Sequence, residues 1–137
     1  MSGWDIFVSR VLTKTEIKIA LAVIFGIKQE NIVIVKNISE SEDMNDATEI
    51  ICQTFLCGDD HFPLRIDIYV YKQQVAASNL SIFKKFSDIV KADVLVSDET
   101  LDPVSFWLIY YGNGTERTIV PDSILDEQNM KEINLIE

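Results

Sequence analysis

The sequence predicts a single α+β domain, residues 1–137, with a mainly antiparallel sheet and two principal helices. The chain has 137 residues, the size of one domain, and 47% of them are hydrophobic, which is enough to form a core. Two stretches carry apolar residues at helical spacing, and several short β-branched or alternating runs surround them. A hairpin turn at 112–115 favours antiparallel pairing.

The first half is predicted to contain one helix among four strands. Thr13-Lys-Thr-Glu16 matches the capping box, with a hydroxyl at the N-cap and a carboxylate three residues later, and Gly26 provides the stop. Residues 48–57 favour a strand by their Thr, Ile and Phe content, although a capped helix ending at Gly58 also fits. The other strands are predicted at residues 4–8, 31–36 and 64–71.

The second half is predicted to contain one helix and three strands. The helix covers residues 79–92, where apolar side chains form one stripe and lysines lie on the solvent-exposed side. Asn113-Gly114 predicts a tight two-residue hairpin turn, because both residues tolerate positive φ angles. In the tail, residues 122–137, a short helix capped by Asp122 or Ser123 is expected. The strands are predicted at residues 94–97, 104–111 and 115–120.

The two halves share one order of elements. Residues 12–72 and 78–121 each run through a helix, a short apolar strand, an acidic loop and a hairpin. The stretch IVIVKNISESEDMND of the first half corresponds to DVLVSDETLD of the second. This order fits either a degenerate duplication of an αβββ unit or the ordinary succession of elements in an α+β domain.

The charge of the chain bears on its partners. The chain has 22 Asp and Glu residues against 12 Lys and Arg, which gives a net charge of −10. Such a surface repels phosphate backbones and anionic lipids, so we expect no nucleic-acid or membrane partner and instead a basic protein. The first ten residues, MSGWDIFVSR, do not resemble a signal peptide, so we expect a cytoplasmic protein. Unpaired strands at the sheet edges would also allow a homodimer.

No residue pattern points to catalysis, a metal or a cofactor. Asp59, Asp60 and His61 supply too few ligands for zinc, and the chain has no second histidine, so a polar loop is expected there. The acidic stretch 37–46 lacks the glycine and the acid spacing of a calcium loop. Two cysteines in apolar runs, Cys52 and Cys57, would point to opposite faces of one strand and remain packed, reduced thiols. We therefore expect a protein that is not an enzyme and needs no cofactor.

Acidic loops and aromatic side chains are the candidate partner-binding residues. Carboxylates follow the first short strand of each half, where they would attract a basic partner. Exposed Tyr and Trp side chains are common interface anchors, although aromatics at strand spacing more often pack into the core. The candidates are Glu40, Glu42, Asp43, Asp46, Asp98, Glu99, Asp102, Tyr69, Tyr71 and Trp107.

In size, acidity and lack of a catalytic motif, the whole chain resembles the small acidic immunity proteins of bacterial toxin–immunity pairs. The resemblance is one of overall profile, without a signature motif, and assigns no residues. It implies a compact, non-enzymatic protein that neutralises one toxin by occluding its active site or substrate-binding surface. The alternative is a small-molecule-binding regulatory domain, with Tyr69, Trp107 and Tyr110 lining an apolar cleft between the two halves.

Overall fold

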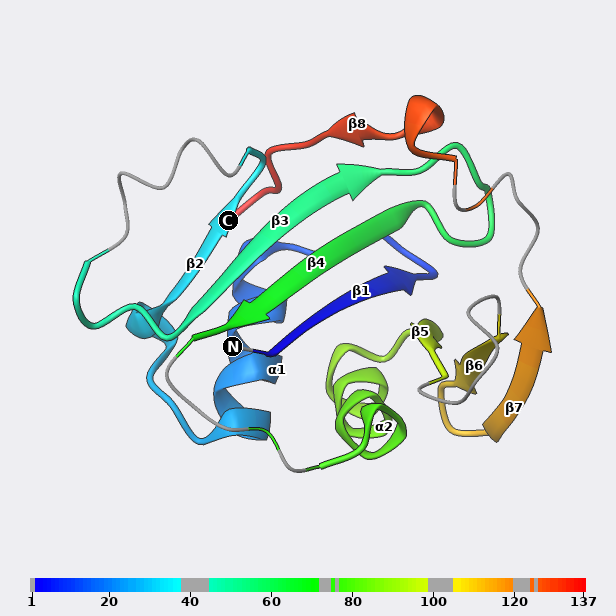
Figure 1. Cartoon of the computed structure of the whole chain (residues 1–137), viewed down its shortest axis with the longest axis horizontal. Helices are drawn as coiled ribbons and strands as arrows, with labels where there is room; N and C mark the ends of the chain where they lie inside the picture. Colours follow the sequence, from blue (N-terminus) through cyan, green and yellow to red (C-terminus); the bar gives the residue numbers. More distant parts are fainter. Residues whose placement is uncertain are drawn as a thin grey trace.

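An eight-stranded sheet with both α-helices packed against one of its faces forms the structure, which is a computed structural model (Figure 1). It describes residues 2–37, 45–71, 75, 77–98, 105–119, 124 and 126–137. The strands are β1 (Ser2–Val8), β2 (Ile32–Val35), β3 (Ile50–Leu56), β4 (Leu64–Val70), β5 (Val94–Ser97), β6 (Ser105–Tyr110), β7 (Gly114–Ile119) and β8 (Lys131–Glu132). The helices are α1 (Lys14–Phe25), α2 (Asn79–Val90) and two 3₁₀ turns, η1 (Gln29–Asn31) and η3 (Glu127–Asn129).

Strand β1 joins the two halves of the sheet. The strands lie in the order β2-β3-β4-β1-β5-β6-β7, and β8 pairs with the last residues of β3. Among the described strands, β2 and β3 pair in parallel and all other neighbours pair antiparallel. The prediction of an α+β domain with a mainly antiparallel sheet and two principal helices is therefore confirmed.

Helix α1 begins and ends where the sequence predicts. The Thr13 hydroxyl accepts a hydrogen bond from the Glu16 backbone N–H, and the Glu16 carboxylate accepts one from the Thr13 backbone N–H, both at 3.1 Å. Gly26 ends the helix with a φ of 65°, a left-handed conformation that glycine adopts without a Cβ clash. Among the described residues, no helix is long and apolar enough to cross a membrane.

Side chains alternate in direction along each strand, so the sheet has two distinct faces. Ile6, Val8, Ile66 and Ile68 are fully buried against both helices and form the centre of the core. The side chains between them project to the opposite side of the sheet. We call this side the outer face, and its central part consists of Gly3, Asp5 and Phe7 of β1, Gln53 and Phe55 of β3, and Arg65, Asp67 and Tyr69 of β4.

Residues 50–56 form strand β3, so the preference for a strand over a helix in this segment is confirmed. Cys52 faces the helices and is fully buried, whereas Cys57 packs against the smaller apolar cluster of the outer face, which contains Phe7 and Leu95. Both thiols are free, and they point to opposite sides as expected.

The β6–β7 turn differs from its prediction. Tyr110 pairs with Gly114, so the loop contains three residues rather than two. The Asn113 backbone N–H donates to the Tyr110 carbonyl at 3.1 Å, and positive φ angles occur at Gly112 and Gly114, not at Asn113. Gly112 is the third of the four turn residues, 110–113, and a positive φ at this position is the pattern of a type II turn. Glycine at 112 permits this turn, which competes with the predicted turn centred on Asn113-Gly114.

The end of the chain closes one edge of β3, which the sequence did not predict. The backbone N–H of Ile133 donates to the Thr54 carbonyl, and the Thr54 hydroxyl donates to the Ile133 carbonyl at 2.7 Å. Leu135 is buried in the core, and the Ile136 carbonyl accepts a hydrogen bond from the first backbone N–H of α1, that of Lys14. The predicted helix cap at Asp122 or Ser123 lies outside the described residues.

The order of elements recurs in the two halves as α1-β2-β3-β4 and α2-β5-β6-β7. The pairing does not recur, because β2 and β3 are parallel whereas β5 and β6 are antiparallel. Duplication of an αβββ unit stays a prediction.

Candidate protein-binding face

Charge is unevenly distributed between the helices and the rest of the chain. The two helical segments, residues 9–31 and 78–92, contain seven Lys or Arg and three Asp or Glu, a net charge of +4. Because the whole chain carries −10, the remaining residues carry −14. The negative charge of the protein therefore belongs to the sheet, its loops and the C-terminal segment.

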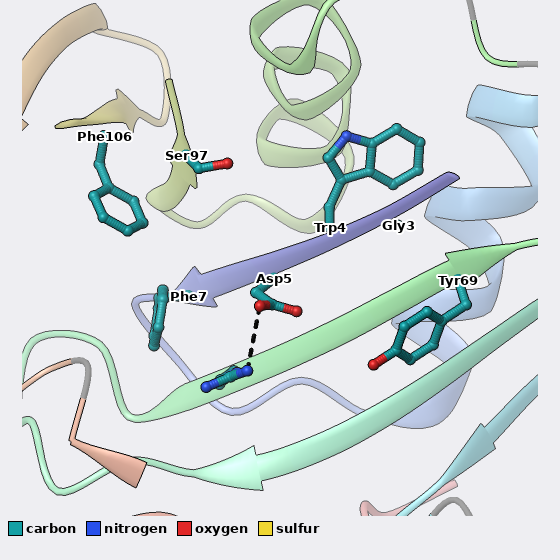
Figure 2. A pocket seen from close by; sticks show the side chains of 8 residues that line it. Gly3, Trp4, Asp5, Phe7, Tyr69, Ser97 and Phe106 are labelled. Atoms are coloured by element: carbon teal, nitrogen blue, oxygen red, sulfur yellow. Dashed lines mark ion pairs between the residues drawn. The ribbon is translucent and has the colours of Figure 1, made fainter. Parts of the chain in front are cut away.

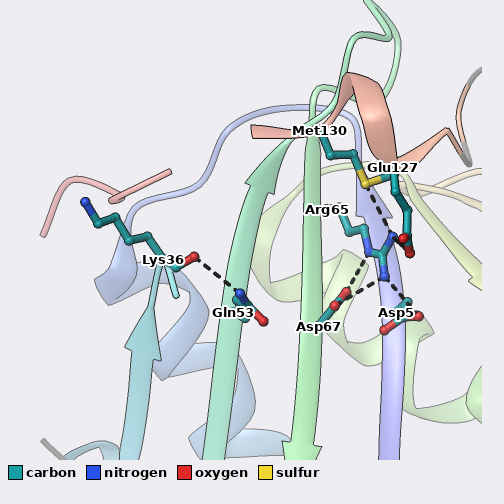
Figure 3. A network of polar contacts seen from close by, with 7 residues as sticks. All are labelled: Asp5, Lys36, Gln53, Arg65, Asp67, Glu127 and Met130. Atoms are coloured by element: carbon teal, nitrogen blue, oxygen red, sulfur yellow. Dashed lines mark hydrogen bonds and ion pairs between the residues drawn. The ribbon is translucent and has the colours of Figure 1, made fainter. Parts of the chain in front are cut away.

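Arg65 is the centre of a carboxylate cluster on the outer face (Figure 3). Its Nε lies 2.7 Å from Oδ1 of Asp67, and its Nη2 lies 3.2 Å from Oδ2 of Asp67 and 3.3 Å from Oδ2 of Asp5. On its other side, Nη1 lies 3.7 Å from Oε1 of Glu127 and 3.3 Å from Sδ of Met130. One guanidinium thus faces three carboxylates, which leaves an excess of negative charge.

Aromatic rings hold the guanidinium in this position. The Arg65 side chain is only 12% exposed, and its Cζ lies 5.9 Å from the centre of the Phe7 ring and 5.5 Å from that of Phe55. Such contacts fix the orientation of a planar guanidinium and reduce its access to water. Arg65 is therefore a structural counter-ion and not a free site for an anion.

The antiparallel register of β1 and β4 places Asp5 directly opposite Asp67. Like charges in this position repel each other. Burial raises the pKa of Asp67 to about 6, against an ordinary value of 3.8; the hydrogen bonds from Arg65 lower it, and the nearby charge of Asp5 raises it again. The site therefore takes up a proton at a mildly acidic pH.

We expect the Asp67 carboxyl group to titrate near pH 6 when its ¹³C chemical shift is followed by NMR. Because the folded-state pKa lies above the ordinary value, Asp67 favours the folded state below about pH 4, and this contribution is lost as the pH rises through about 6. Relative to Asp67→Asn, the wild type should therefore lose stability as the pH rises across this range. A midpoint near 4 and a pH-independent stability difference would contradict this assignment.

A pocket of about 460 Å³ opens on the outer face beside this cluster (Figure 2). Its lining comes from the start of β1, from β4 and from the ends of β5 and β6, and consists of Gly3, Trp4, Asp5, Phe7, Arg65, Tyr69, Ser97 and Phe106. A second pocket, of about 280 Å³, shares Arg65 and is lined also by Phe55, Asp67, Glu127, Met130 and Glu132. Among the residues that the structure describes, four carboxylates and one guanidinium therefore line the two adjoining pockets.

Most carboxylates of the two predicted acidic loops belong to residues that the structure does not describe. Glu40, Glu42, Asp43, Glu99 and Asp102 are not described, so their role stays a prediction.

The described ends of these loops can be placed. Asp46 is exposed near the start of β3. Asp98, which follows β5 at the same end of the sheet, is buried, with its Oδ2 3.1 Å from Nε of Arg117. Asp98 is thus an internal counter-ion and not the surface carboxylate that was expected.

The three candidate aromatics lie in different environments. Tyr69 is half-buried on the outer face and lines the larger pocket, and Tyr71 is exposed just beyond β4. Trp107 faces the helices, packs against the main core and lies beneath Arg117, whose Cζ is 5.0 Å from the ring centre. Tyr110 lines a separate pocket. Tyr69 lies on the outer face, Trp107 on the helical side and Tyr110 beside another pocket, so these three side chains do not line one pocket among the described residues, and the small-molecule-binding alternative stays a prediction.

Asp59, His61 and the two cysteines, the residue types that could serve a metal or a nucleophile, all lie among the described residues. Among them, no group of three or more His, Cys, Asp or Glu side chains could hold a metal ion. Asp59 accepts hydrogen bonds from the backbone N–H groups of His61 and Phe62, as in a polar loop. Burial raises the pKa of Cys52 well above its usual range and that of Cys57 to about 11, so neither is an activated thiolate.

The acidic cluster around Arg65 was not recognised in the sequence. The alternation in LRIDIYVY places Asp67 and Tyr69 on one polar face, which was a usable signal. Asp5, Glu127 and Glu132 gave no such signal, because only the pairing of β1 with β4 and the return of the C-terminal segment bring them to the same place.

Comparisons of the chain with protein-family models, with curated proteins and with solved structures gave no match. The function is therefore inferred from the geometry of the outer face.

Proposed function

We propose that the protein is a non-enzymatic binding protein that neutralises a basic protein partner through the outer face of its sheet. The observation that carries this proposal is the acidic surface around Arg65, where Asp5, Asp67 and Glu127 surround one guanidinium and Glu132 lines the adjoining pocket. The partner would be a toxin whose active or substrate-binding surface is basic, and the protein would act in the cytoplasm in the manner of an immunity protein.

The separation of positive charge on the helices from negative charge elsewhere supports binding of a basic partner through the side opposite the helices. The helical segments carry a net charge of +4, whereas the described residues outside them contain 13 Asp or Glu and four Lys or Arg, a net charge of −9, which gives the described part of the molecule an electric polarity. A basic partner would be attracted to the acidic side and repelled from the helical side, which speeds association and selects one orientation.

Capture from an extract of the native host tests the proposal. The tagged protein should retain one basic protein at low salt and release it as the salt concentration rises, because screening weakens interactions between exposed charges. The captured protein should lose its activity when the purified chain is added back. A partner that is acidic, or a captured protein whose activity is unaffected by the chain, would contradict the proposal.

A further inference from the structure

The larger pocket of the outer face has a carboxylate at its centre and aromatic walls. Asp5 is 55% exposed on its side chain, and in Figure 2 it lies between Phe7 and Tyr69, with Phe106 and Ser97 across the cavity. Asp5 shares its cation, Arg65, with the more deeply buried Asp67, at 3.3 Å against 2.7 Å for Asp67. Because more than half of its side chain is exposed, an incoming group can reach this carboxylate, which has acceptor sites on both oxygens.

Gly3 allows Tyr69 to form one wall of the pocket. Gly3 lies opposite Tyr69 in the sheet, and a Cβ at Gly3 would lie 3.3 Å from the carbonyl oxygen of Ile68 and 3.4 Å from a ring carbon of Tyr69. The missing side chain lets the Tyr69 ring lie close to β1, with its hydroxyl directed toward the side of the pocket where Asp5 lies (Figure 2). Burial, together with the charges of Asp67 and Asp5, raises the pKa of Tyr69, so its hydroxyl stays protonated and can donate or accept.

The protein already holds two guanidinium groups between a carboxylate and an aromatic ring. Arg65 lies between Phe7 and Phe55 and binds Asp67, and Arg117 lies over Trp107 and binds Asp98. The larger pocket presents the carboxylate of Asp5, which Arg65 contacts from one side, together with aromatic rings, around an open space of about 460 Å³.

From this arrangement we propose that the pocket receives an arginine side chain of the basic partner, with Asp5 as the residue that binds its guanidinium. The inference rests on the proposed function and names the chemistry of the contact. A planar guanidinium stacks on aromatic rings and binds a carboxylate in a fixed direction, whereas a lysine ammonium is a more strongly hydrated point charge. The excess of carboxylates around Arg65 makes an incoming cation favourable and an incoming anion unfavourable.

The test uses a small probe and needs no partner. The ¹⁵N-labelled full chain is titrated at pH 7.5 and low salt with Nα-acetyl-arginine methylamide. The matched probes are the corresponding citrulline compound, which has nearly the same shape without the charge, and the lysine compound. We expect saturable shift changes in the backbone amides of Gly3, Asp5, Tyr69 and Ser97 with the arginine probe, weaker ones with lysine, and none with citrulline.

Two variants assign the effect to the pocket. Asp5→Asn should weaken binding of the arginine probe about tenfold, because it removes one charge-assisted hydrogen bond. Tyr69→Ala, which changes no charge, should weaken it about threefold through loss of an aromatic wall. Asp60→Asn removes an exposed carboxylate outside the pocket and should leave binding unchanged. The amide spectra of the variants without probe check that each is folded.

The outcomes separate this inference from the proposed function. Equal binding of arginine and citrulline probes, equal binding of the lysine probe, shifts outside the pocket, or an unchanged affinity in Asp5→Asn would overturn the arginine pocket. The proposed function would survive this if the host extract still yielded a basic, salt-released partner. Conversely, a specific arginine probe site without any basic partner would uphold the pocket and remove the proposed function.

Discussion

Replacement of Arg65 by methionine should lower the free energy of unfolding by about 3 kcal/mol at pH 8, because it leaves a buried carboxylate without its counter-ion. Asp67 is only 8% exposed on its side chain and receives two hydrogen bonds from Arg65. Methionine retains most of the apolar stem between Phe7 and Phe55 but supplies no charge. Urea unfolding of the variant and the wild type measures the difference.

The loss in Arg65→Met should be smaller at pH 5 than at pH 8. Without Arg65, the attraction that lowers the pKa of Asp67 is gone, so its folded-state pKa rises further above the ordinary value. The folded protein then takes up a proton as the pH falls, and stability is regained at low pH. The double variant Arg65→Met with Asp67→Leu should recover much of the loss, because an apolar pair needs no counter-ion.

Lys28→Met provides the matched control for Arg65→Met. Lys28 and Glu30 form an exposed ion pair at 3.9 Å, and such pairs change stability by no more than about 0.5 kcal/mol when broken. Similar losses in the two variants, or a loss in Arg65→Met that does not change with pH, would show that Arg65 does not stabilise a buried charge.

Local signals in the sequence were sufficient for most of the elements. The capping box at Thr13 and Glu16 and the left-handed stop at Gly26 determine α1 through contacts within a few residues, so the sequence predicts them correctly. The turn at 112–114 is also local, but two candidate turns compete there, and the glycine at 112 decides between them. Local chemistry therefore predicts an element well where one conformation is clearly preferred.

The candidate site depends on contacts between distant parts of the chain. Asp5 and Asp67 are 62 residues apart and meet only because β1 inserts between β4 and β5. Glu127 and Glu132 join them because the C-terminal segment returns to β3. Neither pairing leaves a pattern in the sequence near these residues. The predicted carboxylate Asp98, by contrast, was placed by its local acidic surroundings, which do not reveal that Arg117 binds it.

Charge reversal on the outer face should weaken binding of the basic partner about a hundredfold at low salt. Glu127 and Glu132 are both exposed beside the acidic cluster, so Glu127→Lys with Glu132→Lys places two positive charges where the partner's positive surface would dock. Like charges brought together in an interface oppose binding by several kcal/mol, and each tenfold change in affinity corresponds to about 1.4 kcal/mol.

A control with the same change in net charge separates the position of the charges from their number. Glu30→Lys with Asp88→Lys alters two exposed acids of the helical side and adds four units of charge, as the outer-face variant does. We expect its affinity to stay within about threefold of the wild type, because charges away from an interface act mainly on the association rate. Isothermal titration calorimetry with the captured partner gives both affinities, and thermal unfolding checks both folds. Equal weakening by the two variants would mean that only the total charge attracts the partner, and greater weakening by the helical variant would place the interface on the helices.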